Sequence, residues 1–186
     1  RGTFQRAEEA NNNKRIYPKT VLSTQLEKLQ PFIENRRLCG ELDHPANDTV
    51  KLSNASHLIT SLRMEGNEVM GEAELLNTPA GLTAQALVKG GVQIGISSRG
   101  MGTLAENDTG DETKTVNDDF NLITFDIVAD PSTRGAFPGL MESVQKEMCE
   151  GSQCVKKNVE RTLREKVFLT LLRNKLEEKH KLPKKV

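Results

Sequence analysis

The sequence has few aromatic residues and no long hydrophobic run. It contains no Trp and a single Tyr, and hydrophobic residues make up 35% of its 186 positions. We therefore expect a modest core built mainly from aliphatic side chains. No apolar stretch approaches the roughly 20 residues that cross a bilayer, and the first residues lack the apolar segment of a signal peptide. These absences favour a soluble protein that has no membrane partner and is not secreted.

Cysteine is scarce as well, and the net charge is zero. The three cysteines form neither an even set nor a Cys-x-x-Cys pair, which favours reduced thiols over disulfides or a zinc module. The charges are unevenly distributed, because residues 155–186 carry 11 Lys and Arg against 4 Glu, whereas residues 1–154 carry 15 basic against 22 acidic residues. The chain therefore divides into two electrically distinct parts, one ordinary domain and a basic appendage.

Three helices are predicted from hydrophobic spacing. Residues 21–33 have apolar side chains three and four positions apart, and Thr78 with Pro79 provides an N-cap and a first helical residue for a short helix over residues 80–89. The apolar positions of residues 155–176 recur at the same spacing and predict one long basic amphipathic helix.

Strand patterns occupy most of the remaining sequence. A Gly-Asn pair at residues 66–67 separates two β-like runs and predicts a hairpin, and the polar stretch 105–119 predicts a hairpin tip. We expect a loop at residues 11–18 and strands at residues 3–5, 57–64, 69–76, from Val92 onward, and at 120–128.

Residues 92–100 present two adjacent serines at the end of a strand. Val92, Ile94 and Ile96 share one face of an extended chain, so Ser98 follows them inward and Ser97 lies on the opposite face, where it can meet a substrate. The backbone amides of Arg99 and Gly100 are placed to stabilise an oxyanion. A strand ending in an ordinary polar turn is the alternative.

A serine nucleophile needs a base, and the base needs a group that fixes its tautomer. His44 lies in a turn-prone segment and is the natural base for Ser97. The candidates for the third group are Glu41, Asp43, Asp126 and Asp130. Asp126 is preferred, because an unpaired carboxylate inside an apolar strand is costly and a partner is therefore expected.

The other two histidines receive simpler interpretations. We expect His57 at a surface or strand edge and His180 in solvent. A metal site built from Cys39, Asp43, His44 and His57 matches no familiar zinc spacing, so no metal is expected. A nucleic-acid partner is not expected either, because the basic tail has no aromatic besides one Phe that its apolar face already needs.

Four blocks of the sequence, taken in order, resemble the prohead core proteases of tailed phages. They are Asn-Lys-Arg-Ile-Tyr-Pro-Lys at residues 13–19, Gly-Glu-Leu-Asp-His-Pro at 40–45, Gly-Ile-Ser-Ser-Arg-Gly-Met-Gly at 95–102, and the strand from Asp126 to Pro131-Ser132. The resemblance covers about residues 1–135. It implies that His44 and Ser97 are the catalytic pair and that Asp126 matches the family's third residue.

The fold that the resemblance implies is α+β, a mainly antiparallel β-barrel with a few helices like that of herpesvirus assembly proteases. We expect a protease domain over residues 1–140 and a basic helical tail over residues 141–186. The implied function is a serine endopeptidase, without cofactor, that cleaves scaffold or core proteins, capsid proteins and itself. It would act inside the phage prohead in the host bacterial cytoplasm.

The resemblance also implies cleavage after glutamate in a Leu/Ile-x-Glu context. Such a triplet ends at Glu142, where the domain and tail are predicted to join, so we expect self-cleavage after Glu142 to remove the tail. A homo-oligomer is compatible with the sequence, which does not determine the oligomeric state. The alternatives are a non-catalytic capsid or tube protein on the same barrel, and a scaffold-binding protein whose function resides in residues 141–186.

Overall fold

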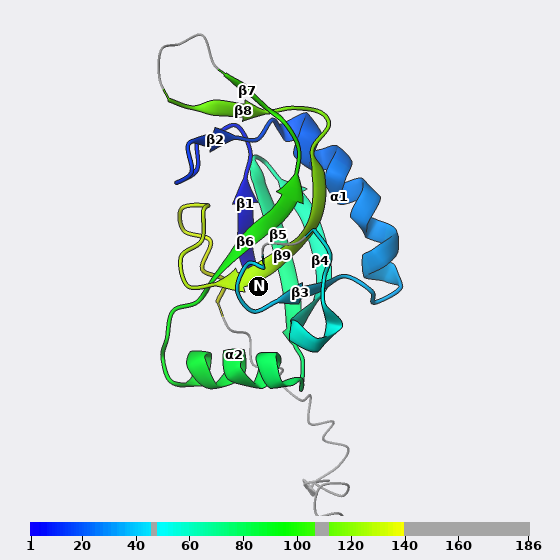
Figure 1. The fold of residues 1–186 in the computed structure, drawn as a ribbon, viewed down its shortest axis with the longest axis vertical. Helices are drawn as coiled ribbons and strands as arrows, with labels where there is room; N and C mark the ends of the chain where they lie inside the picture. Colours follow the sequence, from blue (N-terminus) through cyan, green and yellow to red (C-terminus); the bar gives the residue numbers. More distant parts are fainter. Residues whose placement is uncertain (46–47, 107–111, 140–186) are drawn as a thin grey trace, which may run out of the picture. The chain divides into compact units, whose positions relative to one another are not determined.

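The predicted hairpin forms the longest pair of strands among the described residues (Figure 1). In the computed structural model, which describes residues 1–45, 48–106 and 112–139, β4 (Ala55–Glu65) runs antiparallel to β5 (Glu68–Leu75). Gly66 makes the tight turn with φ of +62°, in the left-handed region that glycine enters without steric cost. The predicted hairpin is confirmed.

The other strands extend this hairpin into a curled half-barrel. The strand β1 (Gly2–Arg6) pairs with β5, and β3 (Cys39–Glu41) pairs with β4, which gives the order β1-β5-β4-β3. A separate antiparallel pair joins β6 (Gly95–Met101) to β9 (Asn121–Val128). The chain just after β3 meets this pair through a bridge between Leu42 and Ile127, so that β3 and β9 lie side by side.

A third sheet has three strands, one fewer than the sheet that contains the hairpin. It has the order β2-β8-β7, with β2 (Arg15–Ile16), β8 (Lys114–Val116) and β7 (Leu104–Glu106). The antiparallel pairing of β7 and β8 bears out the hairpin predicted for the polar stretch 105–119, of which residues 107–111 lie outside the described part. Only β2 and β8 are parallel among the strand pairs of the described residues.

Two helices accompany the strands, together with the 3₁₀ turn η1 (Leu52–Asn54). The helix α1 (Lys19–Glu34) buries its apolar face against β4 and β9, and α2 (Pro79–Lys89) packs on β4 and β5. The Thr78 side chain caps α2 by accepting a hydrogen bond from the Gly81 amide at 3.1 Å, as its sequence predicts.

The core is aliphatic with an aromatic component that was not expected. Edge-to-face ring pairs join Phe4 to Phe125, with centroids 5.3 Å apart, and Tyr17 to Phe120, at 5.4 Å. Such pairs are favourable beyond the area they bury. These four aromatic residues are buried, whereas Phe32 and Phe137 are exposed.

The mainly antiparallel structure with a few helices is confirmed, while the closed barrel stays a prediction. Two local expectations differ from the structure. The strand predicted from Val92 begins at Gly95, and β2 and β3 fall in segments that had no strand pattern, because each is only two or three residues long. The predicted helix at residues 155–176 lies outside the described residues. No helix of the described part is both long and apolar enough to cross a membrane.

Candidate active site

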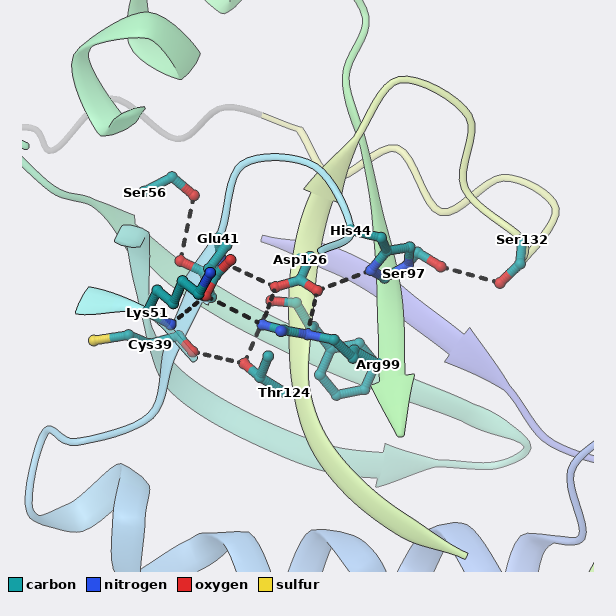
Figure 2. A network of polar contacts seen from close by, with 12 residues as sticks. Cys39, Glu41, His44, Lys51, Ser56, Ser97, Arg99, Thr124, Asp126 and Ser132 are labelled. Carbon is teal, nitrogen blue, oxygen red and sulfur yellow. Dashed lines mark hydrogen bonds and ion pairs between the residues drawn. The ribbon is translucent and has the colours of Figure 1, made fainter. Parts of the chain in front are cut away.

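Asp126 is a fully buried carboxylate in the middle of β9, and it is surrounded by hydrogen-bond donors (Figure 2). Its Oδ1 accepts from the backbone amide of Glu41 at 2.9 Å and from Arg99 Nη2 at 3.1 Å. Its Oδ2 lies 2.8 Å from His44 Nδ1 and 2.8 Å from Arg99 Nε. Both oxygens are thus fixed in direction, and the partner expected for a carboxylate in an apolar strand is present.

His44 reaches Asp126 from the loop that follows β3. The Asp43 amide donates to the Ile127 carbonyl at 2.8 Å, which holds this loop along β9. Since the carboxylate can only accept, Nδ1 of His44 carries the proton of the 2.8 Å hydrogen bond, and the lone pair of the neutral ring is on Nε2. The side chain is 39% exposed, so a partly open base is held by a buried anion.

Ser97 lies directly opposite Asp126 in the β6–β9 pair. Directly opposed residues place their Cβ atoms about 5 Å apart on the same face of a sheet. Ile96 belongs to the core cluster on the other face, so the alternation along the strand separates the two serines as the sequence indicates. Ser97 is nonetheless only 3% exposed. The register therefore brings Ser97 to the same place as the His44–Asp126 pair.

The Ser97 hydroxyl has a partner that the sequence did not suggest. Its Oγ lies 3.1 Å from the Oγ of Ser132, in the loop after β9. A Cβ on Gly95 would meet the Pro131 ring at 2.5 Å, so the missing side chain allows this ring to lie against β6. Close packing of Pro131 thereby places Ser132 beside Ser97.

Another glycine lets β3 approach β9. A Cβ on Gly40 would lie 2.1 Å from the Phe125 carbonyl oxygen and 2.3 Å from the His57 ring. Only glycine fits this position, and the next residue, Glu41, can then direct its amide to Asp126. The local requirement for glycine is therefore part of how the carboxylate is held.

His57 contradicts its sequence prediction, because it is fully buried in β4 instead of lying at a surface or edge. Its Nε2 donates to the Phe125 carbonyl at 3.0 Å, and the Ser56 hydroxyl donates to its Nδ1 at 2.9 Å. Burial lowers the pKa of His57 to about 4, against the opposing effects of the Phe125 carbonyl and the Asp126 charge. The ring is a neutral structural group that joins β4 to β9.

The remaining candidate site residues lie outside the cluster around Asp126 or outside the described residues. Asp43 and Asp130 are exposed, and Asp43 has a left-handed backbone with φ of +65°. Gly100 lies in β6 directly against the Phe120 ring. Glu142 lies outside the described residues. Within the described part of the chain, no group of three His, Cys, Asp or Glu side chains is arranged to hold a metal.

Two charged side chains, Arg99 and Glu41, are buried beside Asp126, and the sequence analysis predicted other roles for both residues. The guanidinium of Arg99, a residue considered above only for its backbone amide, lies buried between Asp126 and Glu41. Glu41, considered as a carboxylate for the histidine, contributes its backbone amide to Asp126 instead. For Arg99, the signal that could have found its side chain is the strand alternation, which puts Ser97 and Arg99 on the same face of β6.

Comparison with known proteins places the chain in a family. The profile of the family described as prohead core protein serine protease matches residues 1–148. The prohead core protein protease of Enterobacteria phage T4 is 31% identical over 153 residues, which are 80% of this chain and 71% of the relative. The solved structure of the bacteriophage T4 capsid assembly protease superposes with a TM-score of 0.66 at 30% identity, covering 70% of this chain and 80% of that chain.

The matched segment of the family profile contains every residue of the cluster around Asp126. The resemblance stated from the four sequence blocks is thereby confirmed. The chain belongs to the prohead core protein serine protease family, and its function is that of a peptidase in prohead maturation.

Proposed function

We propose that the chain is a serine endopeptidase in which Ser97 is the nucleophile, His44 the general base and then the general acid, and Asp126 the group that orients the imidazole. The observation that carries this proposal is the 2.8 Å contact between His44 Nδ1 and Asp126 Oδ2, with Ser97 paired to Asp126 across the strands. A base fixed in one tautomer next to a hydroxyl is the arrangement that nucleophilic acyl transfer requires.

In the first step Ser97 gives its hydroxyl proton to Nε2 of His44 while its oxygen attacks the scissile carbonyl carbon. The imidazolium formed is stabilised by Asp126 and then protonates the leaving amine. Water repeats the sequence on the acyl-enzyme and regenerates the serine. The Ser97 hydroxyl leaves its Ser132 contact when it turns toward His44. In many hydrolases the hydrogen bond between nucleophile and base becomes short only when substrate binds.

The oxyanion of the tetrahedral intermediate is assigned to backbone amides at Arg99 and Gly100. The register shift between these two residues in the β6–β9 pair supports this assignment, because an irregular pair releases backbone groups from regular pairing. Removing one such donor in better-studied hydrolases costs about 100–1000-fold in rate.

The substrates proposed are phage core or scaffold proteins and capsid proteins, cut inside the prohead in the host cytoplasm, with glutamate preferred before the cleaved bond. The names of the T4 relatives support this location and these substrates. Arg134 is the candidate for recognising the glutamate, because it is exposed and lies two residues after Ser132, which contacts Ser97. The Arg99 side chain is already occupied by Asp126 and Glu41.

Self-cleavage after Glu142 is proposed to separate a protease domain over residues 1–140 from the basic tail over residues 141–186. The family match that ends at residue 148 supports a boundary in this region. Incubation of the purified chain followed by mass spectrometry should give a fragment ending at Glu142. A tail that stays intact in active protein would contradict this part of the proposal.

A fluorophosphonate probe tests the nucleophile, because it reacts covalently with an activated serine. We expect labelling of the full chain, loss of labelling in Ser97→Ala, and at least a thousandfold slower labelling in Asp126→Asn, by analogy with triads in which this change leaves the wrong histidine tautomer. The variant Ser98→Ala is the matched control and should label normally. Absence of labelling in the wild-type chain, with scaffold protein also left uncut, would favour a structural role for the fold.

A further inference from the structure

Arg99 is a buried cation placed between two buried anions. Its side chain is 7% exposed, that of Asp126 is 0% exposed and that of Glu41 is 1% exposed. Nη2 lies 3.1 Å from Asp126 Oδ1 and 3.7 Å from Glu41 Oε1, and Nη1 donates to the Thr49 carbonyl at 3.3 Å. Figure 2 shows the Arg99 side chain enclosed within this network of the protein's own groups.

Arg99 contacts both oxygens of Asp126, with a hydrogen bond from Nη2 to Oδ1 and an ion-pair contact from Nε to Oδ2. The Nε contact is 2.8 Å, to the same Oδ2 that accepts from His44. The planar fork of a guanidinium, held against both oxygens of a carboxylate, restrains the plane of that carboxylate, which a single point charge does not do. The direction from which His44 is held is therefore set by Arg99 through Asp126.

Glu41 has a separate function in this cluster. Its carboxylate accepts a hydrogen bond from the backbone amide of Lys51 and approaches Arg99, while its own amide donates to Asp126. Two carboxylates around one guanidinium leave one net negative charge. That charge faces His44, where it favours the imidazolium that forms during catalysis.

We propose that Arg99 and Glu41 are positioning residues of the peptidase: Arg99 fixes the plane of Asp126, and Glu41 holds Arg99 and keeps the cluster anionic toward His44. This inference rests on the function proposed above. It assigns the Arg99 side chain to the Asp126–His44 side of the reaction and leaves the oxyanion to backbone amides alone.

The test uses charge-conserving or shape-conserving variants, because truncating one member of a buried ion cluster leaves an uncompensated charge and endangers folding. Arg99→Lys keeps the positive charge and removes the fork. Glu41→Gln keeps the shape and the acceptor for the Lys51 amide, and it removes one negative charge. The exposed ion pair between Arg36 and Glu74 provides matched controls, Arg36→Lys and Glu74→Gln.

The inactivation rate and the binding constant of the fluorophosphonate probe are measured separately on the full chain. For Arg99→Lys we expect the inactivation rate to fall about 10–100-fold, as for other small misplacements of catalytic groups, with the binding constant changed less than about twofold. For Glu41→Gln we expect a fall of about 3–10-fold, which corresponds to less than about 1.4 kcal/mol in the barrier. Both control variants should react at the wild-type rate.

A double-mutant cycle with Asp126→Asn distinguishes action through Asp126 from direct action on the substrate. If Arg99 acts through Asp126, Arg99→Lys should change the rate less than about threefold in the Asp126→Asn background. The same loss in both backgrounds would overturn the proposal and place the side chain at the oxyanion. The downfield proton resonance of His44 Nδ1–H, assigned by its loss in His44→Ala, should weaken in Arg99→Lys and persist in Arg36→Lys.

Circular dichroism and thermal unfolding establish that each variant is folded before its rate is interpreted. Wild-type rates in folded Arg99→Lys, with an unchanged His44 resonance, would overturn the inference while leaving the peptidase intact. Failure of the wild-type chain to react at all would instead contradict the proposed function, so the two failures are distinguishable.

Discussion

Protonation of the buried His57 should make the protein lose stability in mild acid. The ring is fully buried, and both of its nitrogens are occupied, Nε2 as donor to Phe125 and Nδ1 as acceptor from Ser56. Burial lowers the pKa of His57 from 6.5 to about 4. A proton on Nδ1 would also have to displace the Ser56 hydroxyl from its role as donor.

The sign follows from which state binds the proton. As the pH falls below 6.5, the unfolded chain takes up a proton on His57 while the folded chain does not. The free energy of unfolding therefore decreases as the pH decreases. Below pH 4 the free energy of unfolding has lost about 3 kcal/mol through this group, because each unit of difference between the folded and unfolded pKa values contributes about 1.4 kcal/mol. Between pH 7 and pH 5 the expected loss from this one group is about 2 kcal/mol.

Urea unfolding followed by far-UV circular dichroism at pH 7 and pH 5 measures this effect, since the chain has no Trp for fluorescence. His57→Gln keeps a donor for the Phe125 carbonyl and removes the titration, so it should lose about 2 kcal/mol less than the wild type between the two pH values. The carboxylates, which titrate in both proteins, cancel in this comparison. Equal losses in wild type and variant would refute the reasoning.

Three further predictions concern packing and the site. Gly40→Ala should destabilise the protein by about 3 kcal/mol or more in urea unfolding, because its Cβ would overlap the Phe125 carbonyl, whereas Gly139→Ala, with open space around it, should stay within about 0.5 kcal/mol. Gln25→Met should cost about 1–3 kcal/mol by the same assay, because the buried Leu122 amide loses its 3.1 Å acceptor. Ser132→Ala should change fluorophosphonate labelling less than about threefold, since its contact with Ser97 belongs to the resting form; a hundredfold loss would place Ser132 in the reaction itself.

The long elements were predictable because their information is local. The hairpin of β4 and β5 has alternating strands and a glycine turn, α2 has its Thr78 cap and its proline, and α1 has apolar residues at helical spacing. The short strand β3 was not predictable, because three residues carry no period. Its formation depends on antiparallel pairing with β4 and on the close approach to β9 that Gly40 allows.

The same division applies to the candidate site. Alternation along β6 distinguishes Ser97 from Ser98, and the cost of an unpaired carboxylate in an apolar strand identifies Asp126, so both residues follow from local chemistry. The contacts around Asp126 join residues 27, 82 and 85 positions apart, and no local pattern encodes them. His57 was misjudged for the same reason, because its burial is produced by strands that pair with it from elsewhere in the chain.

The sequence by itself therefore determined the mainly antiparallel class of the fold, the family to which the chain belongs and the candidates for the reactive side chains. Tertiary structure decided how they are arranged: which carboxylate holds His44, which cation holds that carboxylate, and which hydroxyl meets Ser97. The physical reason is that side-chain identity sets what a group can do, whereas direction and burial arise only when strands distant in sequence are paired in register.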